Sequence, residues 1–135
     1  MSSLPESYAS NDCAHAWLLG LLGRLVYSHR LDPGLVASAL HVATGDVVAL
    51  AEGRQVTLGP SPRLPLVVNI LVRVELKLRG DSRAIRRALL APLDTLGGRC
   101  PAEAMTGSLD DLRRVRLAID HLSAPTERWW RVGHR

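Results

Sequence analysis

Apolar residues recur at three- and four-residue spacings along most of this 135-residue chain, which is the pattern of amphipathic helices. The first such stretch predicts a helix from Asp12, which suits the N-cap, to about His29. Gly20 and Gly23 fall inside it, so close packing against a neighbour must compensate for their low helix propensity. Residues 1–11 are polar and rich in serine, and we expect them to be flexible. The apolar face of the helix comprises Trp17, Leu18, Leu21, Leu22, Leu25 and Val26.

The next two predicted helices have the spacing of a helix-turn-helix. One covers residues 33–41 and follows Asp32, a good N-cap residue, and the other covers residues 44–52. Ala37 supplies a small side chain where the two helices must approach closely, and His41 stands near the tight turn, where glycine is often preferred. The core of the motif would consist of Val36, Leu40, Val42, Val47 and Leu50.

Residues 66–79 fit two patterns. Val72, Val74, Leu76 and Leu78 alternate with charged residues, as in a half-buried strand. Leu66, Val67, Ile70, Leu71, Val74 and Leu78 also form a helical stripe. A run of about fourteen residues without a breaker is long for a strand and ordinary for a helix, so we favour the helix.

Further helices are expected over residues 82–91, from Pro101, and from Ser108 to Leu122, where Ser108 and Asp111 resemble a capping box. Gly59 and three prolines up to residue 65 form a stiff connection, which divides a helix-turn-helix region (12–62) from a helical region (63–122). The sequence therefore predicts an all-α fold in which the helix-turn-helix packs with a small C-terminal helical part.

The second helix of the motif is poorly suited to reading DNA. Its outward residues should be Thr44, Gly45, Asp46, Val48, Ala49 and Glu52. None of them is Arg, Lys, Asn or Gln, the side chains best suited to base edges. If the motif binds DNA, we expect Thr44, Arg54 and Arg63 to make the contacts. Otherwise it serves as a scaffold or a dimerisation surface.

Composition and charge narrow the function further. The chain is 47% hydrophobic with no Phe, so the core must be aliphatic. Residues 1–62 carry 3 basic and 5 acidic residues (−2), whereas residues 63–135 carry 14 and 8 (+6), so an anionic partner should meet the second half first. The two isolated cysteines, Cys13 and Cys100, predict reduced thiols in a cytoplasmic protein without a signal peptide or membrane span. No histidine or cysteine stands at a metal-ligand spacing, so we expect neither an enzyme nor a metal or cofactor.

The string Leu96-Gly97-Gly98-Arg99-x-Pro101-x-Glu103-x-Met105, followed by a final helix, resembles the toxin-binding region of Xre/MbcA/ParS-type antitoxins. The resemblance implies a helical, dimeric protein that neutralises an NAD-degrading toxin with a RES domain. Proteins of this family often repress their own operon as well. The residues implied to face the toxin are Pro92, Gly97, Gly98, Arg99, Pro101, Glu103, Arg113, Arg114 and Arg116.

The tail of residues 123–135 is basic and contains Trp129 and Trp130. Trp and Arg are enriched at binding hot spots, so we predict that these tryptophans anchor a partner; alternatively, they pack on the chain's own core. The sequence thus predicts an antitoxin. The alternatives are a helix-turn-helix transcriptional regulator acting on operator DNA, and an adaptor with a degenerate DNA-binding motif.

Overall fold

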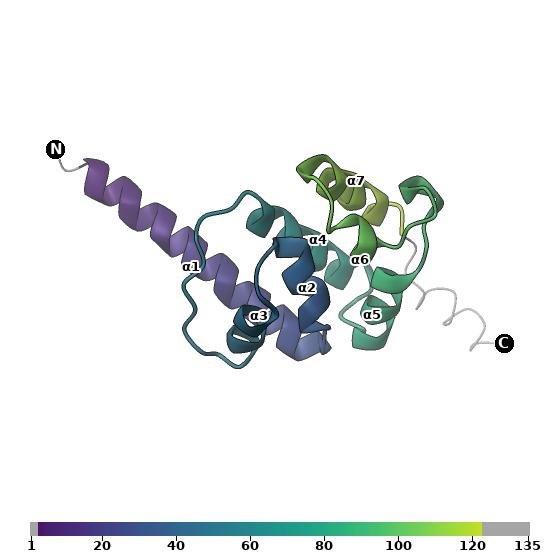
Figure 1. Cartoon of the computed structure of the whole chain (residues 1–135), viewed down its shortest axis with the longest axis horizontal. Helices are drawn as coiled ribbons and strands as arrows, with labels where there is room; N and C mark the ends of the chain where they lie inside the picture. The colour runs from purple at the N-terminus through teal and green to yellow at the C-terminus, as the bar shows by residue number, and fades with distance from the viewer. Residues whose placement is uncertain (1–2, 123–135) are drawn as a thin grey trace.

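The computed structural model describes residues 3–122, with side chains from residue 13 onward, and this part of the chain is entirely helical (Figure 1). It contains no strand, so the all-α fold and the helical alternative for residues 66–79 are confirmed. The α-helices are α1 (Ser3–His29), α2 (Pro33–Leu40), α3 (Thr44–Ala51), α4 (Arg63–Lys77), α5 (Ser82–Leu90), α6 (Pro101–Ala104) and α7 (Leu109–Ile119), with a 3₁₀ turn, η1 (Asp94–Leu96).

Two helices begin earlier than predicted. The first starts at Ser3 rather than Asp12, so residues 3–11, which were predicted to precede the helix, are part of it. Helix α4 starts at Arg63, three positions before Leu66. Pro65, which the predicted connection included, lies in the first turn of α4, and Pro5 lies in the first turn of α1; at both places a backbone N–H has no helical partner to lose.

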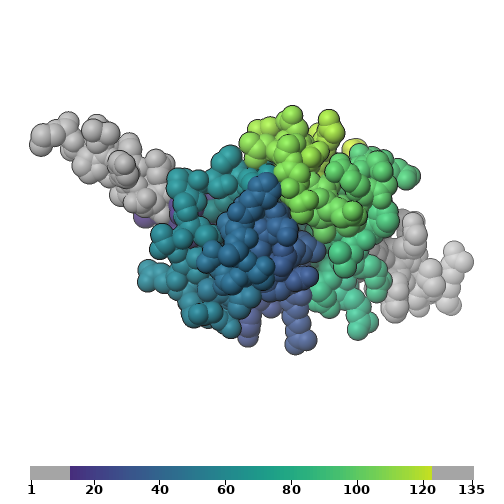
Figure 2. Space-filling view, in the orientation of Figure 1, coloured from purple at the N-terminus to yellow at the C-terminus, as the bar shows by residue number. Residues whose placement is uncertain are grey.

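Both predicted regions contribute to one aliphatic core. Helix α4 contacts α1, α2, α5 and α7, and α1 contacts α3 as well. Figure 2 shows the surface of α2 directly beside that of the C-terminal helical residues, and a single core cluster includes residues of both regions. The two aromatic side chains that the structure describes lie outside the core: Trp17 is 65% exposed and Tyr27 is 73% exposed. Side chains with no exposed surface include Leu22, Val47, Ile70, Leu112 and Ile119.

Helix α1 approaches α3 most closely at Gly23. A Cβ placed on Gly23 would overlap the carbonyl oxygen of Leu50 and lie 2.9 Å from its carbonyl carbon. The prediction of close packing is therefore confirmed at Gly23. It is wrong at Gly20, where a Cβ would meet nothing within 4 Å.

A polar network joins α1, α4 and α5 at the other end of α1. The buried ring of His29 is hydrogen-bonded through Nε2 to Glu75 Oε2 at 2.6 Å and through Nδ1 to Ser82 Oγ at 2.7 Å. Arg24 pairs with the same carboxylate at 3.3 Å. Burial alone would raise the pKa of Glu75, but the hydrogen bonds from His29 and Arg24 outweigh it and hold the pKa below its usual value.

The two glycines of α1 form a matched pair of tests. Gly23→Ala should lower the free energy of unfolding by about 1–3 kcal/mol, because α1 and α3 must separate to admit the methyl group. Gly20→Ala should instead raise it by up to about 1 kcal/mol through helix propensity. Urea denaturation followed by circular dichroism measures both. Equal effects of the two substitutions would contradict the close approach at Gly23.

Acidification tests the Glu75 network. Because the pKa of Glu75 is lowered by folding, its contribution is complete above the usual value of 4.5 and is lost as the pH falls through the folded value. We expect Glu75→Gln to cost about 1–2 kcal/mol at neutral pH and to weaken the loss of stability on acidification. The control is Glu52→Gln, which breaks an exposed ion pair with Arg54 and should leave the pH dependence unchanged. Parallel pH profiles for Glu75→Gln and wild type would contradict this assignment.

Candidate functional site

Helices α2 and α3 have the geometry of a helix-turn-helix. The chain direction turns by 119° between them, across the three residues that separate Leu40 from Thr44. Val36 is 1% exposed, Val47 is fully buried, and Ala37 is buried where the helices meet, as predicted. The other predicted core positions also pack on the core: Leu40, Val42 and Leu50. The two predicted helices and the packing of these positions are therefore confirmed.

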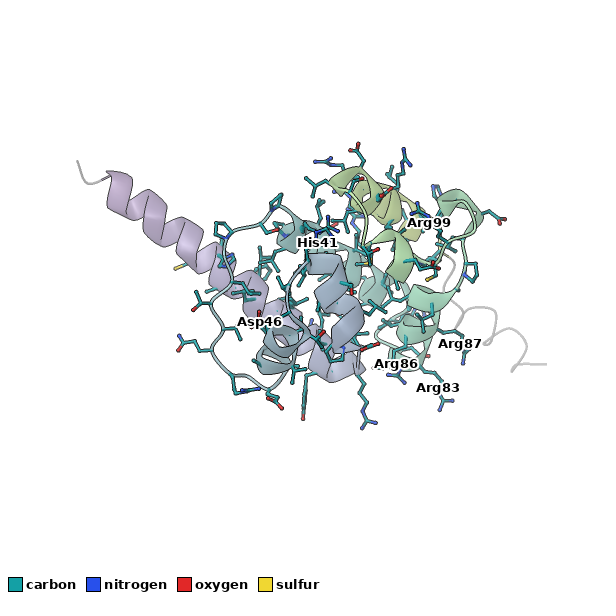
Figure 3. All side chains as sticks on the ribbon, in the orientation of Figure 1. His41, Asp46, Arg83, Arg86, Arg87 and Arg99 are labelled. Atoms are coloured by element: carbon teal, nitrogen blue, oxygen red, sulfur yellow. The ribbon has the colours of Figure 1, made fainter. Side chains whose placement is uncertain are left out.

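His41 gives the turn a direct link to the C-terminal region. It adopts a left-handed conformation (φ 60°), which is the reason glycine is common at such positions. Its side chain compensates for this, because Nε2 lies 2.9 Å from the carbonyl oxygen of Thr106, between α6 and α7 (Figure 3). The turn is thus fixed by a contact that glycine could not make.

The outer face of α3 offers little to DNA. Thr44, Gly45 and Glu52 are exposed, but no residue of α3 is basic. Arg54, which follows the helix, pairs with Glu52 at 2.6 Å, so its charge is locally compensated. Thr44 and Arg54 are therefore both exposed, but Arg54 is engaged in an ion pair, and of the two only Thr44 is available for contact with DNA.

Arg63 does not face solvent, and the prediction that it contacts DNA is wrong. Its guanidinium is buried and donates to three carbonyl oxygens: Ala39 at 2.7 Å, Gly107 at 2.7 Å and Met105 at 2.6 Å. Desolvation lowers the pKa of Arg63, and the nearby carboxylate of Asp111 partly opposes that effect. The side chain therefore caps the C-terminal ends of α2 and α6, where carbonyl oxygens lack helical hydrogen-bond partners.

The loop that follows α5 is held by its own backbone. Leu93 N–H donates to Arg99 O at 3.1 Å, and Gly98 N–H donates to Leu93 O at 3.0 Å. Gly97 (φ 69°) and Gly98 (φ 85°) both occupy the left-handed region, which explains the Gly-Gly pair. Leu96 is buried beneath the loop, while Pro92 and Arg99 are exposed.

The residues implied to face a toxin divide into two groups. Pro101 is the first residue of α6, as predicted, but it is buried, and Arg116 is half-buried. The exposed group is formed by the loop residues Pro92, Gly97, Gly98 and Arg99 together with Glu103, Arg113 and Arg114.

The predicted capping box at Ser108 is confirmed. Trp129 and Trp130 lie outside the described residues.

Asp111 links the loop to α7. Its Oδ1 lies 3.8 Å from Arg99 Nη2 and 4.0 Å from Arg114 Nη1. The hydrogen bonds from Ser108 lead the effects that lower the pKa of Asp111, and the two arginines add to them. This carboxylate therefore stays ionised and holds two exposed guanidinium groups at one edge of the molecule.

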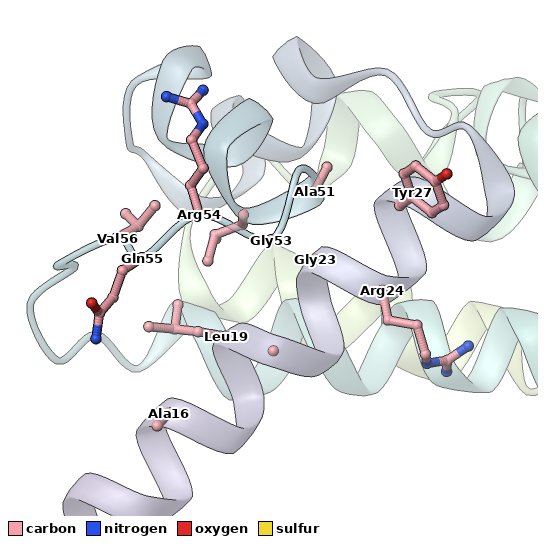
Figure 4. A pocket seen from close by; sticks show the side chains of 12 residues that line it. Ala16, Leu19, Gly23, Arg24, Tyr27, Ala51, Gly53, Arg54, Gln55 and Val56 are labelled. Carbon is pink, nitrogen blue, oxygen red and sulfur yellow. The ribbon is translucent and has the colours of Figure 1, made fainter.

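Two surface features were not predicted. A shallow groove of about 460 Å³ lies between α1 and the segment after α3, lined by small and apolar residues together with Arg24 and Arg54 (Figure 4). Arg83, Arg86 and Arg87 cluster on α5. The sequence signal for the cluster was available: residues 82–90 contain three arginines and no carboxylate.

The described residues hold no cluster of His, Cys, Asp and Glu that could bind a metal ion, and both Cys13 and Cys100 are free thiols. Within residues 3–122, no single helix is long and apolar enough to cross a membrane, although the bent pair α2–α3 would be by length and composition alone. No family model matches the chain, and no similar curated protein or solved structure was found.

Arg63 can be tested by stability. Arg63→Ala leaves three buried carbonyls without their donor and should lower the free energy of unfolding by about 2–4 kcal/mol. Arg63→Lys should recover part of this loss, because one ammonium cannot replace the planar fork. Arg114→Ala, at an exposed arginine with a long ion pair, should change stability by less than about 0.5 kcal/mol. A similarly small effect of Arg63→Ala would contradict the structural role.

Proposed function

We propose that this protein is an antitoxin-like binding protein whose partner is a toxin with a RES domain. The single observation that carries the proposal is the loop between α5 and α6. Its sequence resembles the toxin-binding loop of Xre/MbcA/ParS-type antitoxins, and in the structure this loop is pre-organised by internal hydrogen bonds with Arg99 exposed. A surface already ordered before binding avoids part of the entropic cost of association.

The proposed mechanism is steric. The surface formed by the loop residues Pro92–Arg99 and the exposed arginines of α7 would cover the mouth of the toxin's NAD site, and no chemistry by this chain is needed. Arginine is well suited to such a contact because it buries a large apolar stem and still donates several hydrogen bonds. We place this activity in the cytoplasm, with the protein acting as a homodimer.

The second candidate is a transcriptional regulator. The 119° turn between α2 and α3 favours it, because that is the geometry of DNA-binding helix-turn-helix motifs. The outer face of α3 does not, since it carries no basic side chain and begins with an acidic turn at Asp46. An adaptor that keeps the motif only as a scaffold is the remaining alternative.

The proposal is tested by isolating the tagged protein from the cytosol of its native cells and identifying what is bound by mass spectrometry. We expect a stoichiometric NAD-degrading enzyme. With the purified pair, Arg99→Ala should weaken binding at least about tenfold and reduce inhibition of NAD hydrolysis to match. The control is Arg54→Ala, which removes an exposed arginine outside this surface and should leave inhibition unchanged. Recovery of an unrelated complex, or equal effects of the two substitutions, would contradict the proposal.

A further inference from the structure

The outward face of α5 carries two exposed arginines, with the exposed Leu90 at the end of the helix. Ile85 and Leu89 are buried, whereas Arg83 and Arg87 are exposed on the opposite side of the same helix. The nearest carboxylate in sequence, Asp81, is engaged as the N-cap and accepts the backbone N–H of Ala84 at 3.1 Å. No acidic side chain within α5 therefore offsets its three positive charges.

One arginine of this helix is held by a hydrogen bond, whereas the charges of the neighbouring arginines are not paired with a carboxylate among the described residues. Arg86 is half-buried and donates from Nη1 to the carbonyl oxygen of His29 at 2.7 Å. Arg30 directly follows His29 in the sequence and is exposed. Among residues 13–122, the guanidinium groups of Arg30, Arg83 and Arg87 form no hydrogen bond or ion pair. We call Arg30, Arg83, Arg86 and Arg87 the α5 arginine surface; the last three are labelled in Figure 3.

Six other arginines of the described residues lie within ion-pair distance of a carboxylate. Arg113 pairs with Asp110 at 3.1 Å, Arg73 pairs with Asp120 at 2.7 Å, and Arg54 pairs with Glu52 at 2.6 Å. Arg24, Arg99 and Arg114 also lie within ion-pair distance of a carboxylate. The charges of these six arginines are therefore offset locally, whereas those of Arg30, Arg83 and Arg87 are not, within the part of the chain that the structure describes.

We propose that the α5 arginine surface binds the phosphate backbone of double-stranded DNA without reading its sequence. The planar guanidinium matches a phosphate group and forms paired hydrogen bonds with it. Duplex DNA carries one negative charge per about 1.7 Å of its axis, so a helix of about 13 Å faces several phosphates at once. An acidic protein would have to supply a complementary carboxylate for each arginine, and exposed ion pairs of that kind contribute little.

This interface is separate from the helix-turn-helix and from the loop at Pro92–Arg99. It does not depend on the proposed antitoxin function, since it needs neither α3 as a reading helix nor a toxin. It also explains how a chain whose α3 has no basic side chain would still associate with DNA: α5 supplies the phosphate contacts, and these contribute affinity but no specificity.

The test uses fluorescence anisotropy with a labelled duplex of arbitrary sequence, titrated with the full-length protein at several KCl concentrations. The informative variant is Arg83→Ala/Arg87→Ala. We expect its affinity at low salt to fall at least about tenfold, and the slope of log K against log salt to decrease in magnitude by about 2. Arg83→Lys/Arg87→Lys keeps both charges and should retain the slope.

The matched control is Arg113→Ala/Arg114→Ala, which removes the same net charge from two exposed arginines that already pair with carboxylates. We expect it to bind DNA nearly as well as wild type. Three results would overturn the proposal: no binding of the duplex by wild type at low salt, equal weakening by the two double variants, or an unchanged salt slope for Arg83→Ala/Arg87→Ala. Circular dichroism spectra and thermal unfolding confirm that each variant is folded.

Discussion

The contacts of the Arg63 guanidinium hold the two halves of this protein together. One planar group donates to a carbonyl at the end of α2 and to two carbonyls in the segment that leads from α6 to α7. Helix ends leave such carbonyls without partners, and burying them unsatisfied is costly. A single long side chain meets that need at two helix ends at once. The helix-turn-helix and the C-terminal region are therefore parts of one body, and His41 adds a second bond between them at Thr106.

The molecule distributes its charge in three ways. Arg63 is buried and serves the fold, and so does the network of Glu75 and His29, which ties α1 to α4 and α5. The arginines near the loop and α7 are exposed but balanced by Asp110 and Asp111, which suits a surface that recognises a protein by shape and hydrogen bonding. Arg83 and Arg87 of α5 are exposed and have no carboxylate partner among the described residues, which suits a polyanion. The net charge of the chain would not distinguish these three roles, because arginine occurs in all of them.

Much of the fold follows from local patterns in the sequence. The apolar spacing placed the helices, Asp32 caps α2 as expected, and Ser108 caps α7 through the predicted capping box. The errors have a common cause. Pro65 suggested a break because its position within the first turn of α4 could not be known beforehand. Arg63 suggested a solvated cation because its three acceptors lie 24, 42 and 44 residues away, and no local pattern reports such contacts. The same limit applies to the loop: the Gly-Gly pair predicts a turn, but not the hydrogen bonds that close it on Leu93.

Among the described residues, the core holds no aromatic side chain, and this has a practical consequence. Aliphatic side chains are transparent in the near ultraviolet, so the described part of the core carries no chromophore of its own. Trp17 and Tyr27 are largely in contact with water in the folded state, and their emission has little reason to change when the core comes apart. Among the described residues, intrinsic fluorescence is therefore a probe of the surface of α1. Unfolding of the core is followed instead by the far-ultraviolet circular dichroism of the backbone amides.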